Sequence, residues 1–175
     1  NDTCEMDQKK LSSMMVGRPV LFENLNRTGE PGGVKIRVEH LSALDNRRLP
    51  AVNDLSLEVR AGEILGIAAI EGNGQSELIE VLTGMRPAQS GTVTVCGSDI
   101  TNRTPDLVRR AGLACVPEDR ISTGVSPDAS VTENLLVGKH REKRFQRGFH
   151  MDRGAVEAYA GEMYAKYDIR GYGID

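Results

Sequence analysis

The stretch ILGIAAIEGNGQSELIEVLTG at Ile64–Gly84 decides the fold that the sequence predicts. It opens with an apolar run, which is typical of a strand buried on both faces. Two glycines, Gly72 and Gly74, then allow backbone conformations that other residues adopt only with strain. From Ser76 the apolar residues recur at helical spacing as far as Gly84, a residue type common at helix ends. A strand, a glycine loop and a helix together direct backbone N–H groups at an anion.

The glycine loop matches the phosphate-binding pattern Gly-x-x-x-x-Gly-Lys-Ser/Thr only in part. Gly74 and Ser76 keep the second glycine and the hydroxyl, but Ala69 replaces the first glycine and Gln75 replaces the lysine. The cation that would neutralise a β/γ-phosphate is therefore missing. A dinucleotide-binding Gly-x-Gly-x-x-Gly pattern also fails, because Glu77 stands in place of the third glycine. The loop alone leaves phosphate binding and a purely structural turn equally open.

Composition limits the class of protein. The 175 residues can form one hydrophobic core, or one core with an extension. With 22 basic and 25 acidic residues the net charge is −3, which gives no general attraction to nucleic acid or anionic membranes. The sequence contains no apolar run near the roughly 20 residues of a membrane span, and no signal-peptide pattern. Cys96 and Cys115 are expected to be buried, reduced thiols within strands. These features indicate a cytosolic compartment.

Hydrophobic periodicity predicts an α/β domain that begins at residue 34. Strands are predicted, besides 64–70, at residues 34–39, 55–59, 92–96 and 113–116. We expect the first three of these four to form an antiparallel layer beside strand 64–70, and 113–116 to run next to 64–70 in a deeper sheet. Helices are predicted after Thr104 and after Asp152, because each of these residues can cap a helix start, and a further helix is predicted over 130–137.

The residues before this domain have a different composition. Residues 1–16 are predicted to be the tail of a preceding unit, because apolar residues appear at helical spacing near their end. Residues 17–33 are rich in proline and glycine and are predicted to be a linker.

Four motifs occur together, namely Gly-Glu-Ile-Leu-Gly-Ile-Ala (62–68), Glu-Gly-Asn-Gly-Gln-Ser-Glu-Leu (71–78), Val-Pro-Glu-Asp-Arg (116–120) and Thr-Glu-Asn-Leu (132–135). In this order and spacing they resemble the second nucleotide-binding cassette of bacterial ABC importers for simple sugars and nucleosides, whose ATPase subunits carry two cassettes in one chain. The form of the second motif is similar to the nucleoside-type branch. The resemblance implies an α/β, P-loop NTPase-like cassette over 34–175, with a mixed sheet, an antiparallel β-layer and the start of the helical subdomain. Because Met-Val-Gly-Arg at 15–18 is similar to the end of the family's first cassette, it also implies that residues 1–16 are the tail of that preceding cassette.

The resemblance also implies ATP and Mg²⁺ as cofactors, bound weakly or not at all by this chain alone. It places nucleotide contacts at Glu71, Gly72, Asn73, Gly74, Gln75, Ser76, Glu77 and Glu118, and the Mg²⁺ ligand at Ser76. Glu118 stands where the family has the glutamine of its Q-loop, and a carboxylate there repels the triphosphate unless Mg²⁺ lies between them. Residues 41–52 contain no aromatic residue that could stack on adenine.

The family's signature motif, its Walker B region and its switch histidine are expected to follow residue 175. The chain is therefore interpreted as a cassette fragment with no catalytic residues and no hydrolysis of its own. The implied partners are the transmembrane permease subunits and the other cassette of the same chain, at the cytoplasmic face of the bacterial inner membrane. The alternative is a non-catalytic docking module that contacts the transmembrane subunit. An independent enzyme ranks third, because no nucleophile–base or metal-ligand constellation is evident in the sequence.

The basic run at residues 139–147 is most simply a solvated surface. Contact with the transmembrane subunits, or with anionic lipid headgroups, is the functional alternative. Nucleic acid is not expected as a partner, because only Phe145 and Phe149 interleave with the basic residues and the rest of the chain is acidic on balance.

Overall fold

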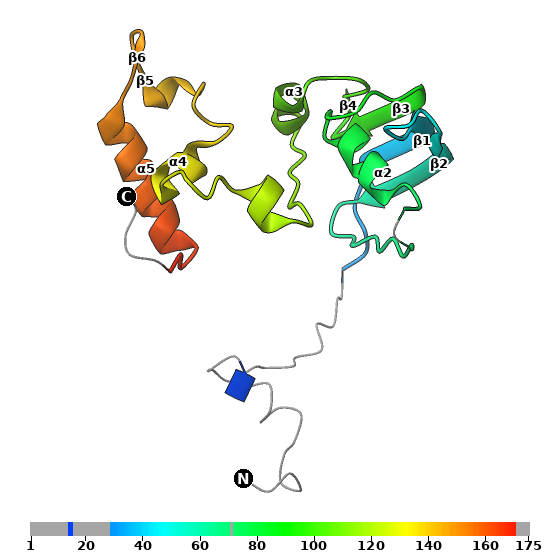
Figure 1. Ribbon diagram of the computed structural model, residues 1–175, viewed down its shortest axis with the longest axis horizontal. Helices are drawn as coiled ribbons and strands as arrows, with labels where there is room; N and C mark the ends of the chain where they lie inside the picture. Colours follow the sequence, from blue (N-terminus) through cyan, green and yellow to red (C-terminus); the bar gives the residue numbers. More distant parts are fainter. Residues whose placement is uncertain (1–13, 16–28, 71, 171–175) are drawn as a thin grey trace, which may run out of the picture.

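The computed structural model of the protein describes residues 14–15, 29–70 and 72–170. A four-stranded sheet in the order β2-β1-β3-β4 forms its main layer, and every neighbouring pair of strands is antiparallel (Figure 1). The strands are β1 (Val34–Leu44), β2 (Pro50–Arg60), β3 (Ser90–Val95) and β4 (Ser98–Asp99). This sheet confirms the predicted antiparallel layer, and β1 and β2 extend beyond the ranges predicted from alternation.

The turn between β1 and β2 is closed by Asp45. Its carboxylate accepts hydrogen bonds from the N–H groups of Arg47 and Leu49, each at 2.8 Å. The Asp45 N–H in turn donates to the Leu49 carbonyl at 2.8 Å. The Leu49 N–H has the largest effect and lowers the pKa of Asp45, burial opposes it, and hydrogen bonds and charge from Arg47 lower the pKa further, so the pKa lies below its usual value.

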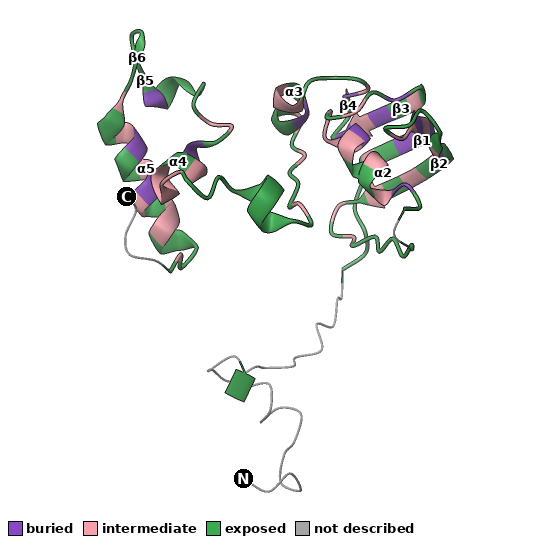
Figure 2. Ribbon diagram, viewed as in Figure 1, coloured by how far each residue is buried: buried purple, intermediate pink, exposed green. Residues whose placement is uncertain are grey.

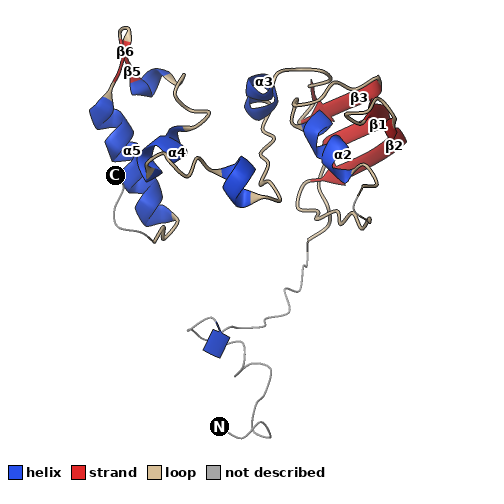
Figure 3. Ribbon diagram, viewed as in Figure 1, coloured by secondary structure: helices blue, strands red, loops and turns tan. Residues whose placement is uncertain are grey.

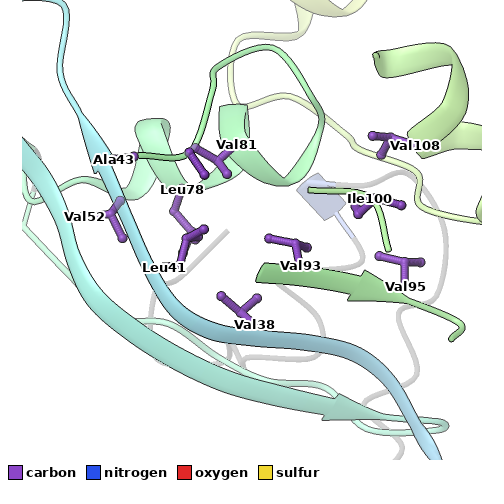
Figure 4. Close-up of a cluster of buried hydrophobic side chains, with 11 residues drawn as sticks. Val38, Leu41, Ala43, Val52, Leu78, Val81, Val93, Val95, Ile100 and Val108 are labelled. Carbon is purple, nitrogen blue, oxygen red and sulfur yellow. The ribbon is translucent and has the colours of Figure 1, made fainter. Parts of the chain in front are cut away.

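Helix α2 (Gln75–Leu82) covers one face of the sheet. Leu78 and Val81 project from this helix into the core between it and the strands (Figure 4). Arg86 links α2 to the end of β1. Its guanidinium donates to the Glu80 carboxylate in the helix and to the carbonyl of Leu44, the last residue of β1, both at 2.7 Å. The buried members of this core are Val38, Leu41, Ala43, Val52, Leu78, Val81, Ala88, Val93, Val95, Ile100 and Val108.

The burial predicted for the cysteines is wrong. Strand β3 ends at Val95, and Cys96 and Gly97 form a two-residue turn into β4. Both turn residues have positive φ, 50° and 81°, as a type I′ hairpin turn requires. Cys96 therefore faces solvent, and Cys115 is exposed as well; neither forms a disulfide.

Two of the predicted strands are also wrong. Residues 64–70 and 113–116 form no hydrogen-bonded strand and are drawn as loops in Figure 3. Their apolar side chains lie largely in solvent, with Ile64 79%, Ile70 78% and Val116 87% exposed. A strand buried on both faces needs strand partners and a covering layer on each face. The described residues supply neither, so the deeper sheet is not formed within them.

The C-terminal part is mostly helical. It comprises α3 (Pro105–Arg110), the π-helical turn η2 (Arg120–Gly124), α4 (Val131–Leu136), the 3₁₀ turn η3 (Lys143–Phe145), β5 (Gln146–Arg147), β6 (His150–Met151) and α5 (Arg153–Lys166). The predicted helix starts are confirmed. Ser130 caps α4 by accepting from the Glu133 N–H at 3.2 Å, and Asp152 caps α5 by accepting from the Ala155 N–H at 3.1 Å.

A second, smaller core holds this part together. Leu136, Phe145 and Val156 are buried against one another, and Tyr159 packs at their edge. Figure 2 shows buried positions around α4, α5 and the base of the β5–β6 hairpin, separated from those of the sheet by largely exposed chain. In the described ranges, none of the helices combines the length and apolar character needed to cross a membrane.

Most of the predicted N-terminal tail and linker lies outside the described residues. Met14 and Met15 are helical and exposed. At the far end of the predicted linker, the Gly32 N–H donates to the Ala61 carbonyl at 3.0 Å, and the Ala61 N–H donates to the Gly33 carbonyl at 2.9 Å. The predicted boundaries at residues 16 and 33 stay predictions.

Candidate nucleotide-binding site

The loop that leads into α2 closes on a single backbone carbonyl. The C=O of Ile70 accepts a hydrogen bond from the Asn73 N–H at 3.1 Å and another from the side-chain amide of Gln75, Nε2, at 2.8 Å. Gln75 occupies the lysine position of the phosphate-loop pattern. Its amide is therefore engaged by the loop backbone. The sequence indicated the missing charge but not this hydrogen bond.

Gly74 fixes the point at which α2 begins. It is the buried N-cap residue of the helix and has φ +90°. A Cβ at this position would overlap the carbonyl oxygen of Ala51 in β2. The close approach of two backbones and the left-handed conformation both require glycine here, so the glycine loop is pressed against the sheet.

The first turn of α2 offers backbone donors to an anion. No described residue accepts a hydrogen bond from the N–H of Ser76 or Glu77, and Gly74 has no side chain with which to cap the helix. The Ser76 side chain is exposed, and a Cβ added to Gly72 would meet nothing within 4 Å. This arrangement fits a bound phosphate. The carboxylate of Glu77, in the same turn, opposes it.

The residues present also fit Mg²⁺ in a limited way. Within the described ranges no group of three His, Cys, Asp or Glu side chains could hold a metal ion. Mg²⁺ commonly binds through one or two protein oxygens together with substrate phosphates and water. The exposed hydroxyl of Ser76 could supply such an oxygen beside a nucleotide.

The other predicted contacts are not assembled around this loop. Glu71 lies outside the described residues. Glu118 is exposed and precedes η2, and Figure 1 shows that turn well away from the loop before α2. The structure therefore brings residues 72–77 together but does not place Glu118 with them.

Asp119, which the sequence reasoning missed, organises the chain next to Glu118. Its carboxylate accepts hydrogen bonds from the N–H groups of Ile121 at 3.0 Å and Ser122 at 2.9 Å, and so caps η2. The Ser122 side chain, followed by these backbone donors, holds the pKa of Asp119 below its usual value, against a smaller effect of burial. Aspartate is a common N-cap residue, and this preference is the sequence signal that could have identified Asp119 as a cap.

Comparison with known proteins defines the class of this chain. The family model described as "ABC transporter" matches residues 52–169, which is well over half of the sequence. The chain therefore belongs to the ABC transporter family.

Individual relatives are ATP-binding proteins of importers. The chain is 38% identical over 97% of its length to the guanosine import ATP-binding protein NupO of Bacillus subtilis, and 40% identical over 97% to the glucose import ATP-binding protein TsgD13 of Haloferax volcanii. It covers 33% and 31% of those two proteins, so it spans about a third of the length of the relatives it matches.

Solved structures confirm the fold class. A nucleotide-free ATP-binding cassette from an ABC transporter superposes with a TM-score of 0.58 at 23% identity, covering 77% of this chain and 55% of that one. A second ATP-binding cassette of an ABC transporter gives a TM-score of 0.54, also at 23% identity and with the same coverages. These likenesses show the α/β fold of an ABC cassette.

Proposed function

We propose that this chain is the nucleotide-binding module of an importer for nucleosides or simple sugars, and that it binds Mg-ATP only weakly. Family membership supports an ATP-binding role. The relatives are named for the import of guanosine, nucleosides, glucose, galactose and ribose, which supports the substrate class. The partners would be permease subunits at the cytoplasmic face of the membrane and a second cassette.

The Gln75 amide is the observation that carries the weak-binding proposal. At the position where a phosphate loop has its lysine, Gln75 is neutral and donates to the Ile70 carbonyl at 2.8 Å. A nucleotide phosphate therefore meets no cation from this residue. To engage the phosphate at all, the amide must first give up its bond within the loop.

The binding free energy lost with the lysine exceeds the binding free energy that the helix N-terminus contributes. The N-terminus of α2 contributes about 0.3–1 kcal/mol to binding an anion. A charge-assisted hydrogen bond from the missing lysine is worth about 1.5–3 kcal/mol. Glu77 adds negative charge in the first helical turn. The balance is unfavourable for tight binding, even though the backbone donors are well placed.

The proposed contacts follow from the same geometry. Backbone N–H groups of residues 72–77 would surround the phosphates, and the Ser76 hydroxyl would meet Mg²⁺. Glu118 would approach the nucleotide only if the segment before η2 moved toward the loop and Mg²⁺ lay between the charges. Residues 41–52 contain no aromatic side chain, so adenine would lack a stacking partner there. We assign this chain no catalytic residue.

Calorimetric titration with Mg-ATP tests the proposal. We expect the unmodified chain to bind more weakly than micromolar, and Gln75→Lys to tighten binding by about tenfold or more, since 1.4 kcal/mol corresponds to one decade. Neither form should hydrolyse ATP.

Gln146→Lys is the matched control. Gln146 is exposed in β5, outside the glycine loop, and the substitution adds the same charge. It should leave the affinity unchanged. Micromolar binding by the unmodified chain, or an equal gain from both lysine variants, would contradict the proposal.

A further inference from the structure

The hairpin β5–β6 carries a fully exposed aromatic residue at its tip. The pairing of the two strands leaves Gly148 and Phe149 as a two-residue turn. Gly148 has φ +65°, and Phe149 is not among the residues with positive φ. This is the pattern of a hairpin turn with glycine at its first central position. Phe149 is fully exposed, and Figure 1 shows the hairpin projecting beyond α4 and α5.

The base of this hairpin is firmly packed. Phe145 is 1% exposed, and its ring meets the Tyr159 ring edge-on at 5.2 Å. The Arg144 guanidinium lies 4.5 Å from the centre of the Phe145 ring and 4.7 Å from that of Tyr159. The Asp152 N–H donates to the Phe145 carbonyl at 2.9 Å. The exposure of Phe149 is thus set by the fold of the hairpin.

Positive charge is concentrated around the hairpin. Residues 139–153 contain six of the 22 basic residues and only two of the 25 acidic ones. Glu142 is already paired with Arg144 at 2.8 Å and Lys139 at 3.7 Å, while Asp152 caps α5. Within the described chain no ion pair involves the remaining cations, Arg141, Lys143, Arg147 and Arg153.

We propose that the β5–β6 hairpin binds the surface of an anionic lipid bilayer, with Phe149 inserted among the headgroups and the unpaired cations on lipid phosphates. Aromatic rings are enriched at the membrane–water interface. Lysine and arginine near an anionic leaflet strengthen binding, and the attraction fades within a Debye length. The rest of the chain is acidic on balance, so the hairpin is the side that such a surface attracts. This contact is separate from the nucleotide site.

Tryptophan fluorescence can report the insertion directly, because the chain contains no tryptophan. Phe149→Trp provides a single probe at the tip. Vesicles of phosphatidylglycerol mixed with phosphatidylcholine should shift its emission to the blue, and brominated acyl chains should quench it. Phosphatidylcholine alone should do neither. Met85→Trp, at a position 73% exposed outside the hairpin, is the control and should not respond.

Vesicle sedimentation measures how much Phe149 and the basic side chains each contribute to membrane binding. Phe149→Ser should lower partitioning onto the anionic vesicles about tenfold, and Lys143→Gln or Arg147→Gln about fivefold each. Lys35→Gln removes a charge from an exposed position of β1, outside the hairpin, and should have no effect. Circular dichroism checks that each variant keeps its fold. Equal binding to phosphatidylcholine, no loss with Phe149→Ser, or a blue shift only in membranes that contain the permease subunits would overturn the proposal.

Discussion

At the scale of single residues, Gly74 is the position where substitution should be most damaging. Gly74→Ala would force a Cβ against the Ala51 carbonyl while keeping φ at +90°. We expect it to reduce the free energy of unfolding of the sheet region by about 2–3 kcal/mol. Gly72→Ala is the matched control, because its φ is +88° but nothing lies within 4 Å of the new Cβ. It should cost only about 1 kcal/mol, the lower end of the penalty for a side chain in the left-handed region. Urea unfolding followed by circular dichroism measures the free energy of unfolding of both variants. Equal reductions for Gly74→Ala and Gly72→Ala would contradict the close contact between Gly74 and Ala51.

A second prediction at the residue scale concerns the pH dependence of the Asp119 cap. Its pKa in the folded chain is lowered by Ser122 and the nearby backbone donors. A lowered folded pKa means that its contribution to stability is complete above the unfolded pKa and is lost as the pH falls through the folded pKa. The amide resonance of Ser122, followed by NMR, should therefore titrate with a midpoint below that of an ordinary aspartate. Asp119→Asn should abolish the titration. A midpoint at or above the ordinary value would show that the cap is absent.

At the scale of elements, Phe145 holds η3 and the hairpin against α4 and α5. Phe145→Ala should reduce the stability of this part by about 3–5 kcal/mol, because it removes a buried ring and leaves a cavity. Hydrogen exchange at the amides of α5 is the measurement. Phe149→Ala truncates an equally large but exposed ring and should change protection by less than about 0.5 kcal/mol. Similar effects from the two substitutions would refute the assigned packing.

The elements that could be predicted from sequence are those whose signals are local. Alternation predicts β1, β2 and β3, and the capping residues Thr104 and Asp152 predict the starts of α3 and α5. Residues 64–70 were predicted wrongly because an apolar run shows what could be buried, whereas burial itself depends on partners elsewhere. Cys96 was placed in a strand because nothing in its identity signals φ 50°. At the candidate site, the neutral Gln75 could be predicted, but its bond to Ile70 and the distance of Glu118 from the loop depend on tertiary structure.

At the scale of the whole molecule, the described chain has two separate cores and uncovered apolar segments. Ile64, Ile70 and Val116 are all more than three-quarters exposed. We expect the purified chain to be marginally stable and prone to aggregation, and its two parts to unfold separately. Differential scanning calorimetry with size-exclusion chromatography is the measurement. One sharp transition at high temperature from a monodisperse sample would contradict the expectation.

The most direct test of the nucleotide-site proposal compares two replacements of one side chain. Gln75→Ala removes the bond to Ile70 without adding charge, whereas Gln75→Lys removes the same amide and restores a cation. Competition titrations with Mg-ATP should give a dissociation constant at least about tenfold lower for the lysine variant than for the alanine variant. The alanine variant should stay close to the unmodified chain. Equal dissociation constants for the lysine and alanine variants would contradict the claim that the missing charge is what makes this phosphate loop weak.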